Sequence, residues 1–178
     1  MTWKRSFATG ALLLVVSTTP VWADPLPVPF LRQEKNGCGA ASVGMVWRYW
    51  NERLPGQTVT PPLPKGVYQA LYRPASSGIA LADMRRYLED AGFRAYTWRG
   101  EWADLEQHLA KGRPVIVGLK PKQEAAMHFV VVTGSGDGRA WLNDPTRSKP
   151  SRLRREQFER QWNLAGRWTL LAAPPVPE

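Results

Sequence analysis

The spacing of apolar residues predicts helices mainly in the first half of the chain and strands mainly in the second. Over residues 39–50, apolar side chains recur at three- and four-residue intervals, which predicts a buried helix that begins at or near Cys38. Residues 81–91 carry an apolar stripe that ends at Gly92, as in an amphipathic helix with a glycine stop. Shorter helices are predicted at 67–72, 102–110 and 155–162.

Apolar runs and alternating patterns predict strands over 93–98, 114–119, 128–133, 140–143 and 168–172. The strands at 128–133 and 140–143 flank the glycine-rich segment 134–138, which predicts a hairpin whose turn centres on Gly136. Pro and Gly punctuate residues 55–65, which are expected to form a loop. Helices followed by strands favour the α+β class.

The N-terminal residues predict export from the cytosol. Lys4 and Arg5 precede a short apolar stretch, and small residues at the end of Val21–Ala23 match a cleavage site, so residues 1–23 are expected to be a signal peptide. The apolar stretch is shorter than the roughly 20 residues that span a bilayer. One domain over 24–173 and a loose tail over 174–178 are expected, and the protein should be extracytoplasmic, periplasmic or secreted, without a membrane span after cleavage.

Composition narrows the possible functions. A hydrophobic content of 43% and nine tryptophans among 178 residues exclude a wholly disordered chain. One cysteine excludes an intramolecular disulfide framework, and two histidines beside it exclude a Cys/His-rich structural zinc site. The net charge of +9 permits an anionic partner, and basic residues gather over 147–167. A solvated surface is the favoured interpretation, and no nucleic-acid partner is expected.

The cysteine stands among small residues at the predicted start of a helix, in Asn36-Gly37-Cys38-Gly39-Ala40. The positive end of the helix dipole stabilises a thiolate and lowers the pKa of a thiol at this position. The flanking glycines leave room for another backbone to approach the sulfur. Cys38 is therefore a candidate nucleophile, and the alternative is a buried structural cysteine that packs as a small hydrophobic residue.

Of the two histidines, His128 is the better candidate for a base. His108 lies in a polar stretch of predicted helix and is expected to be a solvated surface residue. His128 opens an apolar strand, and a hairpin turn centred on Gly136 would place Asp144 directly opposite it. A carboxylate at that distance can orient the imidazole.

Gln33 is a candidate donor to an oxyanion. It precedes the cysteine by five residues, so its side-chain amide could lie beside the thiol and act together with the backbone N–H of Cys38. Its position taken alone favours a surface glutamine in a loop.

The combined pattern of Gln33, Cys38-Gly39-Ala40-Ala41, His128 and Asp144-Pro145 resembles the papain-like cysteine peptidases, and more narrowly the double-glycine-leader (bacteriocin-processing) peptidases. The resemblance implies a papain-like fold, in which an N-terminal helical part with the active-site helix packs on a C-terminal antiparallel sheet. It implies that Cys38 is the nucleophile, His128 the base, Asp144 its orienting group and Gln33 part of the oxyanion hole. It implies a peptide or protein substrate and no metal or organic cofactor.

The chain departs from the best-known members of that group, which are cytosolic domains fused to exporters. The activity class therefore transfers more safely than the substrate, and the pattern assigns neither a cleavage-site preference nor an oligomeric state. Two alternatives stay open. One is a peptidase-like binding module of the cell envelope without catalysis, and the other is a cell-wall peptide amidase or acyl transferase that uses the same three groups.

Overall fold

The computed structural model describes residues 24–54, 64–74 and 78–175. The expected signal peptide over 1–23, most of the expected loop over 55–65 and the last three residues of the expected tail lie outside these ranges. Within them, the elements in chain order are α1 (Cys38–Arg53), α2 (Pro64–Leu71), α3 (Leu81–Asp90), β1 (Arg94–Arg99), α4 (Trp102–Ala110), β2 (Val115–Leu119), β3 (His128–Gly136), β4 (Arg139–Asn143), β5 (Ser151–Arg154), α5 (Arg155–Leu164) and β6 (Trp168–Ala173).

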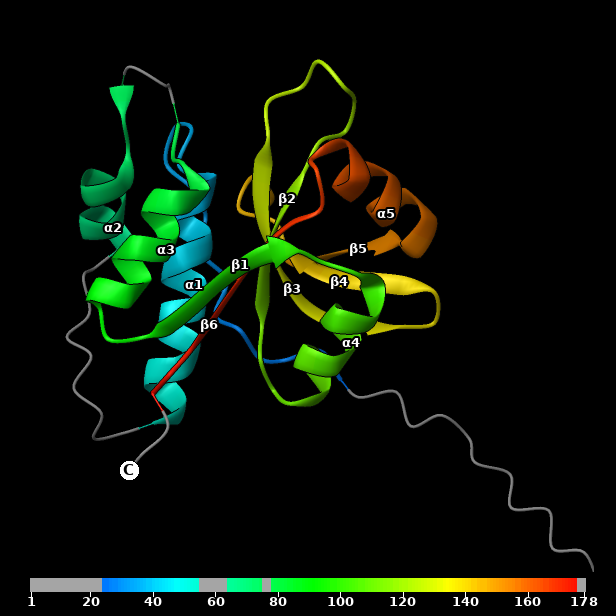
Figure 1. Ribbon diagram of the computed structural model, residues 1–178, viewed down its shortest axis with the longest axis horizontal. Helices are drawn as coiled ribbons and strands as arrows, with labels where there is room; N and C mark the ends of the chain where they lie inside the picture. Colours follow the sequence, from blue (N-terminus) through cyan, green and yellow to red (C-terminus); the bar gives the residue numbers. More distant parts are fainter. Residues whose placement is uncertain (1–23, 55–63, 75–77, 176–178) are drawn as a thin grey trace, which may run out of the picture.

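The strands form one antiparallel sheet in the order β1-β6-β2-β3-β4-β5. Helices α1, α2 and α3 lie on one face, and α4 and α5 lie on the other (Figure 1). The predicted α+β class is confirmed, because a helical layer that begins with α1 packs on a sheet built mostly from the second half of the chain. None of the helices in the described ranges has the length and apolar character that a bilayer crossing requires.

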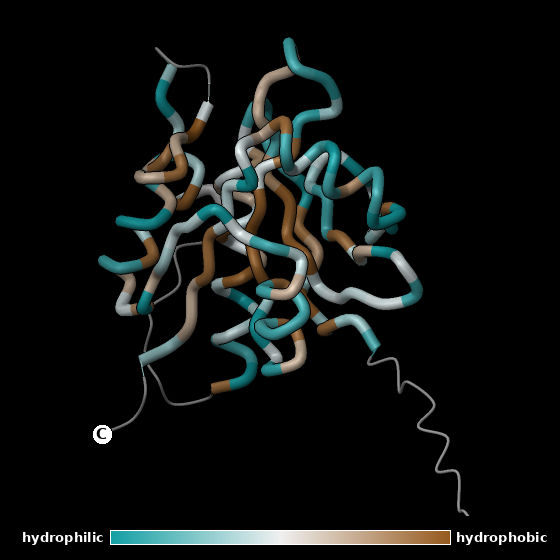
Figure 2. The backbone as a smooth tube through the Cα atoms, turned by 45° about the vertical axis from the view of Figure 1, so that its right-hand side comes forward, coloured by the Kyte–Doolittle hydropathy of each residue, from teal (hydrophilic) through white to brown (hydrophobic). Residues whose placement is uncertain are grey.

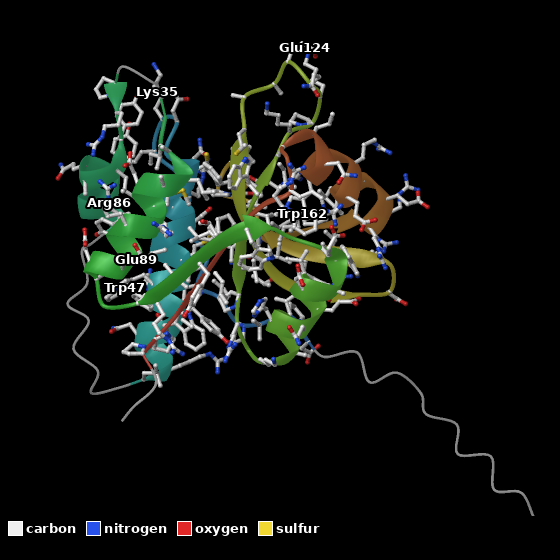
Figure 3. All side chains as sticks on the ribbon, viewed as in Figure 1. Lys35, Trp47, Arg86, Glu89, Glu124 and Trp162 are labelled. Atoms are coloured by element: carbon white, nitrogen blue, oxygen red, sulfur yellow. The ribbon has the colours of Figure 1, made fainter. Side chains whose placement is uncertain are left out.

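Both faces of the sheet are buried, so the core has two parts. Alternate residues of β3 point to opposite faces: Phe129 and Val131 pack toward α1, whereas Val130 and Val132 pack toward α4 and α5. The apolar strands appear as the hydrophobic centre of the molecule, with polar segments around them (Figure 2). Trp47 and Trp162, labelled in Figure 3, mark these two parts of the core.

Helix α1 is buried along most of its length because its first turns consist of small residues. Gly39 has no room for a side chain: a Cβ there would lie 2.9 Å from Sδ of Met84 and 3.0 Å from Cγ2 of Ile79. The start of α1 therefore packs directly against α3 and the segment before it. The helix begins at Cys38, as the sequence predicts.

The hairpin between β3 and β4 differs from the prediction. Residues 134–136 belong to β3, and the turn consists of Asp137 and Gly138, both with positive φ (55° and 62°), as in a two-residue type I′ turn. The predicted turn centre at Gly136 is therefore wrong, and the turn has two residues instead of the five of the glycine-rich segment 134–138.

One strand was not predicted, and one histidine was placed wrongly. Strand β5 is an edge strand with two exposed arginines and a single leucine, so it lacks the apolar pattern of a strand. His108 is half-buried instead of solvated: its ring lies 5.5 Å from that of Trp98, and its Nδ1 is buried without a hydrogen-bond partner among the described residues.

Candidate active site

The thiol of Cys38 lies at the N-terminal end of α1 and is partly buried. Gly37, the residue before the helix, makes no side-chain cap, so backbone N–H groups of the first turn remain available to the sulfur. The backbone N–H of Phe129 in β3 also donates a hydrogen bond to it. The sulfur therefore lies where the helical layer meets the sheet.

His128 connects the thiol to a carboxylate. Nε2 of its ring lies 2.7 Å from Oδ1 of Asp144, and the ring also hydrogen-bonds the thiol of Cys38. With Nε2 on the carboxylate, Nδ1 is the nitrogen left to face the sulfur. The structure thus brings together three of the residues that the sequence analysis selected, Cys38, His128 and Asp144.

Asp144 is itself held in place by the turn that follows it. Its Oδ1 accepts hydrogen bonds from the backbone N–H of Thr146 at 3.0 Å and from Oγ1 of Thr146 at 2.7 Å, and its Oδ2 lies 3.4 Å from Nε of Arg147. These donors fix the carboxylate so that one oxygen points at the imidazole. The sequence gives no signal for Thr146, whose role depends on the conformation of this turn.

A β-bulge separates the register of the hairpin tip from the register that brings His128 and Asp144 together. Beyond the turn, Gly134 pairs with Trp141, but closer to the site Val131 pairs with Asn143, so Thr133 is an extra residue in β3. When the pairing of Val131 with Asn143 is continued by one residue, Asp144 lies opposite Val130. Val130 is two residues from His128 on β3, so Asp144 and His128 share a face of the sheet. The predicted direct opposition of the two residues is therefore wrong, although their side chains meet diagonally.

The three groups shift one another's pKa values in the direction of an ion pair. Burial raises the pKa of the Cys38 thiol, but hydrogen bonds from His128 and from the Phe129 N–H outweigh burial and bring the pKa below its ordinary value. Burial lowers the pKa of His128, yet its bonds to Asp144 and Cys38 raise the pKa to about 9. For Asp144, burial raises the pKa, but the hydrogen bonds from His128 and Thr146 hold it well below the usual range.

Gln33 lies in the same cavity as the thiol. Its backbone N–H donates to the carbonyl oxygen of Pro145 at 3.1 Å, which ties the segment before Cys38 to the turn after Asp144. Its Oε1 is buried and has no hydrogen-bond partner among the described residues. The side chain is therefore not the solvated surface glutamine that its sequence position alone favours, and it lines the cavity together with Cys38 and His128.

This cavity, of about 620 Å³, runs past the thiol and has apolar walls. Ile79 and Leu81 contribute one side, and Met127 and Trp168 contribute to the side formed by the sheet. Met127 lies over Gly118, where a Cβ would approach its Sδ to 2.8 Å. The sequence analysis did not select these wall residues, because nothing in the local pattern separates an apolar groove residue from a core residue.

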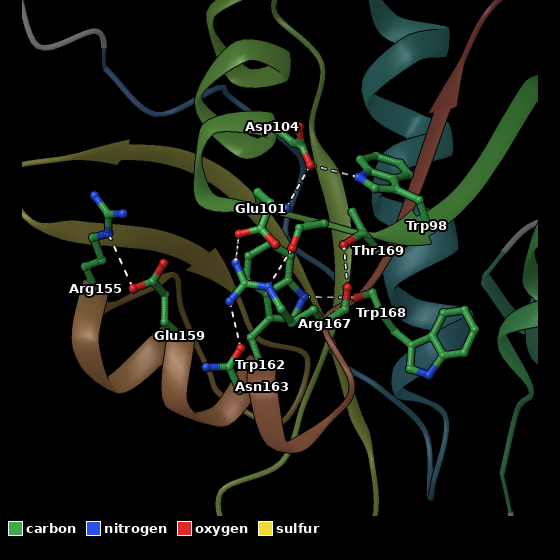
Figure 4. A network of polar contacts seen from close by, with 11 residues as sticks. Trp98, Glu101, Asp104, Arg155, Glu159, Trp162, Asn163, Arg167, Trp168 and Thr169 are labelled. Atoms are coloured by element: carbon green, nitrogen blue, oxygen red, sulfur yellow. Dashed lines mark hydrogen bonds and ion pairs between the residues drawn. The ribbon is translucent and has the colours of Figure 1, made fainter.

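Trp168 is one of two large apolar side chains that are exposed in the described part of the chain, with 41% of its surface accessible. A polar network holds the start of β6 in place (Figure 4). Arg167 has a positive φ of 56°, and its guanidinium reaches the carbonyl oxygen of Gly100 at 2.6 Å and Glu101 at 2.9 Å. The ring of Trp168 is thereby presented at the groove.

Metal ligands do not gather in this site. In the described ranges, no three side chains of His, Cys, Asp or Glu lie close enough together to hold a metal ion. The chemistry that the arrangement itself offers is that of a thiol, an imidazole and a carboxylate in a hydrogen-bonded row.

Comparison with known proteins assigns the chain to a family of peptidases. The model of the Peptidase_C39 like family matches residues 25–169. A curated protein from Pseudomonas fluorescens, named "Probable functional amyloid protease FapD", is 30% identical over 128 residues, which are 71% of this chain. The chain spans about half (53%) of the length of that relative.

Solved structures support the same fold. A double glycine motif protease from an AMS/PCAT transporter, in complex with the leader peptide, has a TM-score of 0.65 at 23% identity, over 85% of this chain and 94% of that one. The peptidase domain of Streptococcus ComA, from a bi-functional ABC transporter involved in a quorum sensing pathway, has a TM-score of 0.67 at 18% identity, over 83% of this chain and 99% of that one. The expected papain-like fold is confirmed.

Proposed function

Since the chain is a cysteine peptidase of the C39-like family, we propose that it hydrolyses peptide bonds with Cys38 as the nucleophile, His128 as the base and acid, and Asp144 as the group that orients His128. The observation that carries this proposal is the row of hydrogen bonds from the thiol through the imidazole to the carboxylate. A nucleophile, a base and an orienting group in that order form the arrangement that acyl transfer requires.

The site favours a thiolate beside an imidazolium. The pKa of Cys38 is lowered and the pKa of His128 is raised to about 9, and both shifts favour transfer of the proton from the sulfur to the ring. A thiolate attacks a carbonyl carbon without a prior proton transfer. Asp144 stabilises the imidazolium and keeps Nδ1 directed at the sulfur.

The reaction proceeds in two halves. The sulfur forms a bond to the carbonyl carbon of the substrate, and the carbonyl oxygen becomes an oxyanion. As this intermediate collapses, the C–N bond breaks and His128 gives its proton to the leaving amine, which yields a thioester on Cys38. Water then attacks the thioester while His128 takes its proton, and the carboxylic acid leaves as the thiol is regenerated.

Gln33 and the backbone N–H of Cys38 are the proposed donors to the oxyanion. The Gln33 side chain lines the cavity beside the thiol and makes no hydrogen bond to another described residue, so its Nε2–H donors are not engaged by a structural contact. An amide and a backbone N–H that converge on one point stabilise the charge that develops during attack.

We further propose an extracytoplasmic substrate that is a peptide or a protein. The apolar walls of the groove, Ile79 and Leu81 against Met127 and Trp168, suit an extended chain with apolar side chains. The features of residues 1–23 support export by a signal peptide. The name of the Pseudomonas relative adds a functional amyloid protein to the candidate substrates.

The test uses purified protein without residues 1–23. We expect iodoacetamide to label Cys38 and the protein to cleave unstructured peptides, whereas Cys38→Ala protein does neither. A Cys38→Ala variant with full peptidase activity would refute the proposed nucleophile. Mass-spectrometric comparison of secreted proteins after incubation with wild-type or Cys38→Ala protein identifies the cut sites, and a peptidoglycan arm tests the cell-wall alternative.

A further inference from the structure

A second cavity, of about 320 Å³, lies on the other side of the His128–Asp144 pair. It meets the groove described above only at Ala126 and His128, which line both cavities. Its walls come from β2, β4, β5 and α5 and from the loop between β2 and β3, at whose tip Glu124 is labelled in Figure 3. The volume is at the lower end of the range of small-molecule sites.

The floor of this cavity is apolar. Leu119 and Leu142 are almost fully buried, and Leu153 of β5 is partly buried beside them. Ser151 and Leu153 point into the cavity, because alternate residues of a strand share a face, whereas Arg152 and Arg154 point away from it. This floor can accept an aliphatic side chain.

One wall carries an arginine with unused donors. Arg147 contacts Oδ2 of Asp144 through Nε at 3.4 Å, and its side chain is 57% exposed. A guanidinium has five N–H donors in a planar fork that fits a carboxylate in a bidentate manner. The single long contact to Asp144 leaves the terminal nitrogens available to an anion at the mouth of the cavity.

Two glutamines complete the lining. Gln157 and Gln161 are four residues apart on α5, so their side chains share one face of the helix, and both face the cavity. Neither side chain makes a hydrogen bond to any residue in the described part of the chain, and both are only half-exposed. A primary amide both donates and accepts, as a peptide group does, so this pair matches the backbone of a bound peptide.

We propose that this cavity binds the free C-terminal end of a peptide whose last residue is aliphatic. The carboxylate pairs with Arg147, the last peptide group bonds to Gln157 and Gln161, and the side chain lies on Leu119, Leu142 and Leu153. The negative charge of Asp144 does not oppose such a ligand, because His128, Thr146 and Arg147 already surround that carboxylate with donors.

The binding itself does not depend on the proposed hydrolysis, so it is measured on the Cys38→Ala protein. The probe is N-acetyl-glycyl-leucine, and its C-terminal amide is the control ligand. We expect the acid to bind at least tenfold more tightly than the amide, since the amide loses the charged hydrogen bonds to Arg147. The side-chain amide NMR signals of Gln157 and Gln161 should shift on titration, while that of Gln107 on α4 should not.

Matched variants locate the interaction. Arg147→Met should lower the affinity for the acid at least tenfold. Arg152→Met removes an equal charge from the face of β5 that points away from the cavity, and it should change this affinity by less than twofold. Gln161→Leu should also weaken binding and leaves the contact to Asp144 in place. Equal affinity for acid and amide, equal effects of the two arginine variants, unshifted glutamine signals or no binding at millimolar probe would each overturn the proposal.

A second arm identifies the source of the C-terminus and rests on the proposed function. With active protein, a substrate whose C-terminus is amidated should have a higher KM than the free acid if the substrate's own end occupies the cavity. An unchanged KM together with binding of the probe assigns the cavity to the C-terminus of another peptide. If the protein without residues 1–23 hydrolyses no peptide but its Cys38→Ala variant binds the probe, the proposed function is refuted and the proposed binding site is not.

Discussion

The backbone N–H of Gln33 donates a hydrogen bond to the carbonyl oxygen of Pro145 at 3.1 Å. A second bond, from Nδ2 of Asn143 to the carbonyl oxygen of Val28 at 3.0 Å, lies on the same two segments. The strand end that carries Asp144 and the segment that leads to Cys38 are thus fastened to each other, independently of the side chains proposed to react. The geometry of the site is therefore preorganised by contacts between the two segments that carry Cys38 and Asp144.

The first prediction concerns Gln33. If its amide stabilises the oxyanion, Gln33→Ala should lower kcat by about 10²–10³-fold, as loss of one such donor does in other acyl-transfer enzymes. The rate of Cys38 alkylation by iodoacetamide should change little, because alkylation forms no oxyanion. Gln107→Ala, which removes an exposed glutamine on α4, serves as the control. A parallel loss of alkylation in Gln33→Ala would indicate damage to the thiol site instead.

The second prediction is a bell-shaped dependence of kcat/KM on pH. Activity should rise as pH increases through the lowered pKa of Cys38, because the thiolate forms there, and should fall as pH increases through about 9, because His128 then loses the proton that the leaving amine needs. In His128→Ala, the pH at which the alkylation rate reaches half its maximum should move upward. An unmoved alkylation profile would contradict the ion pair.

The third prediction separates the carboxylate from the base. Asp144→Ala removes the hydrogen bond that raises the pKa of His128, so the alkaline limb of the pH profile should move below 9. Thr146→Val keeps the carboxylate but removes the Oγ1 donor, and should shift the same limb less. The ring pKa can be followed directly by NMR of His128, with His108 as an internal reference. Equal effects of the two variants would argue against Asp144 as the principal partner.

The fourth prediction contrasts two tryptophans that are six residues apart. Trp162 is fully buried, so Trp162→Ala should lower the free energy of unfolding by about 3–5 kcal/mol. Trp168 is partly exposed in the groove, so Trp168→Ala should cost about 1 kcal/mol or less yet raise KM for peptides with apolar residues. Tyr96→Ala, the other exposed aromatic position, should leave KM unchanged. Urea unfolding and peptide kinetics distinguish these outcomes.

The fifth prediction tests the β-bulge. Deletion of Thr133 should make the ladder continuous and leave Asp144 opposite Val130, on the face of His128, so the activity and the raised pKa of His128 should persist. Deletion of the opposed pair Gly136 and Arg139 shortens the hairpin by one rung and should preserve both properties. Loss of the raised pKa of His128 in the Thr133 deletion would show that the bulge itself, and not the register next to the site, brings the two side chains together.

Much of the fold was predictable, because apolar periodicity reports burial directly. Helix α4 has the predicted bounds, and α1 starts at the predicted cysteine. Strand β5 was not predicted because it is an edge strand: exposed arginines occupy alternate positions, and pairing with β4, not local propensity, makes it a strand. The β3–β4 turn was misplaced because two of the three glycines in the segment 134–138, Gly134 and Gly136, lie within the strand.

The candidate site was predictable where chemistry and local pattern coincide. A thiol at a helix start and a histidine at the mouth of an apolar strand are rare enough to select Cys38 and His128. The surroundings of these residues were not predictable, since Ile79, Met127 and Trp168 come together only through the packing of segments far apart in the sequence. The half-burial of His108 likewise depends on contact with Trp98, which lies on a different element.

The extra residue at Thr133 separates two parts of the hairpin that can change independently. The pairs Val132–Leu142 and Val131–Asn143, on the site side of the bulge, set the strand face on which Asp144 lies. Changes at the tip that add or remove one residue from each strand do not alter these pairs, and neither does loss of the unpaired residue itself. The tip can therefore vary in length and composition during evolution while His128 keeps its carboxylate.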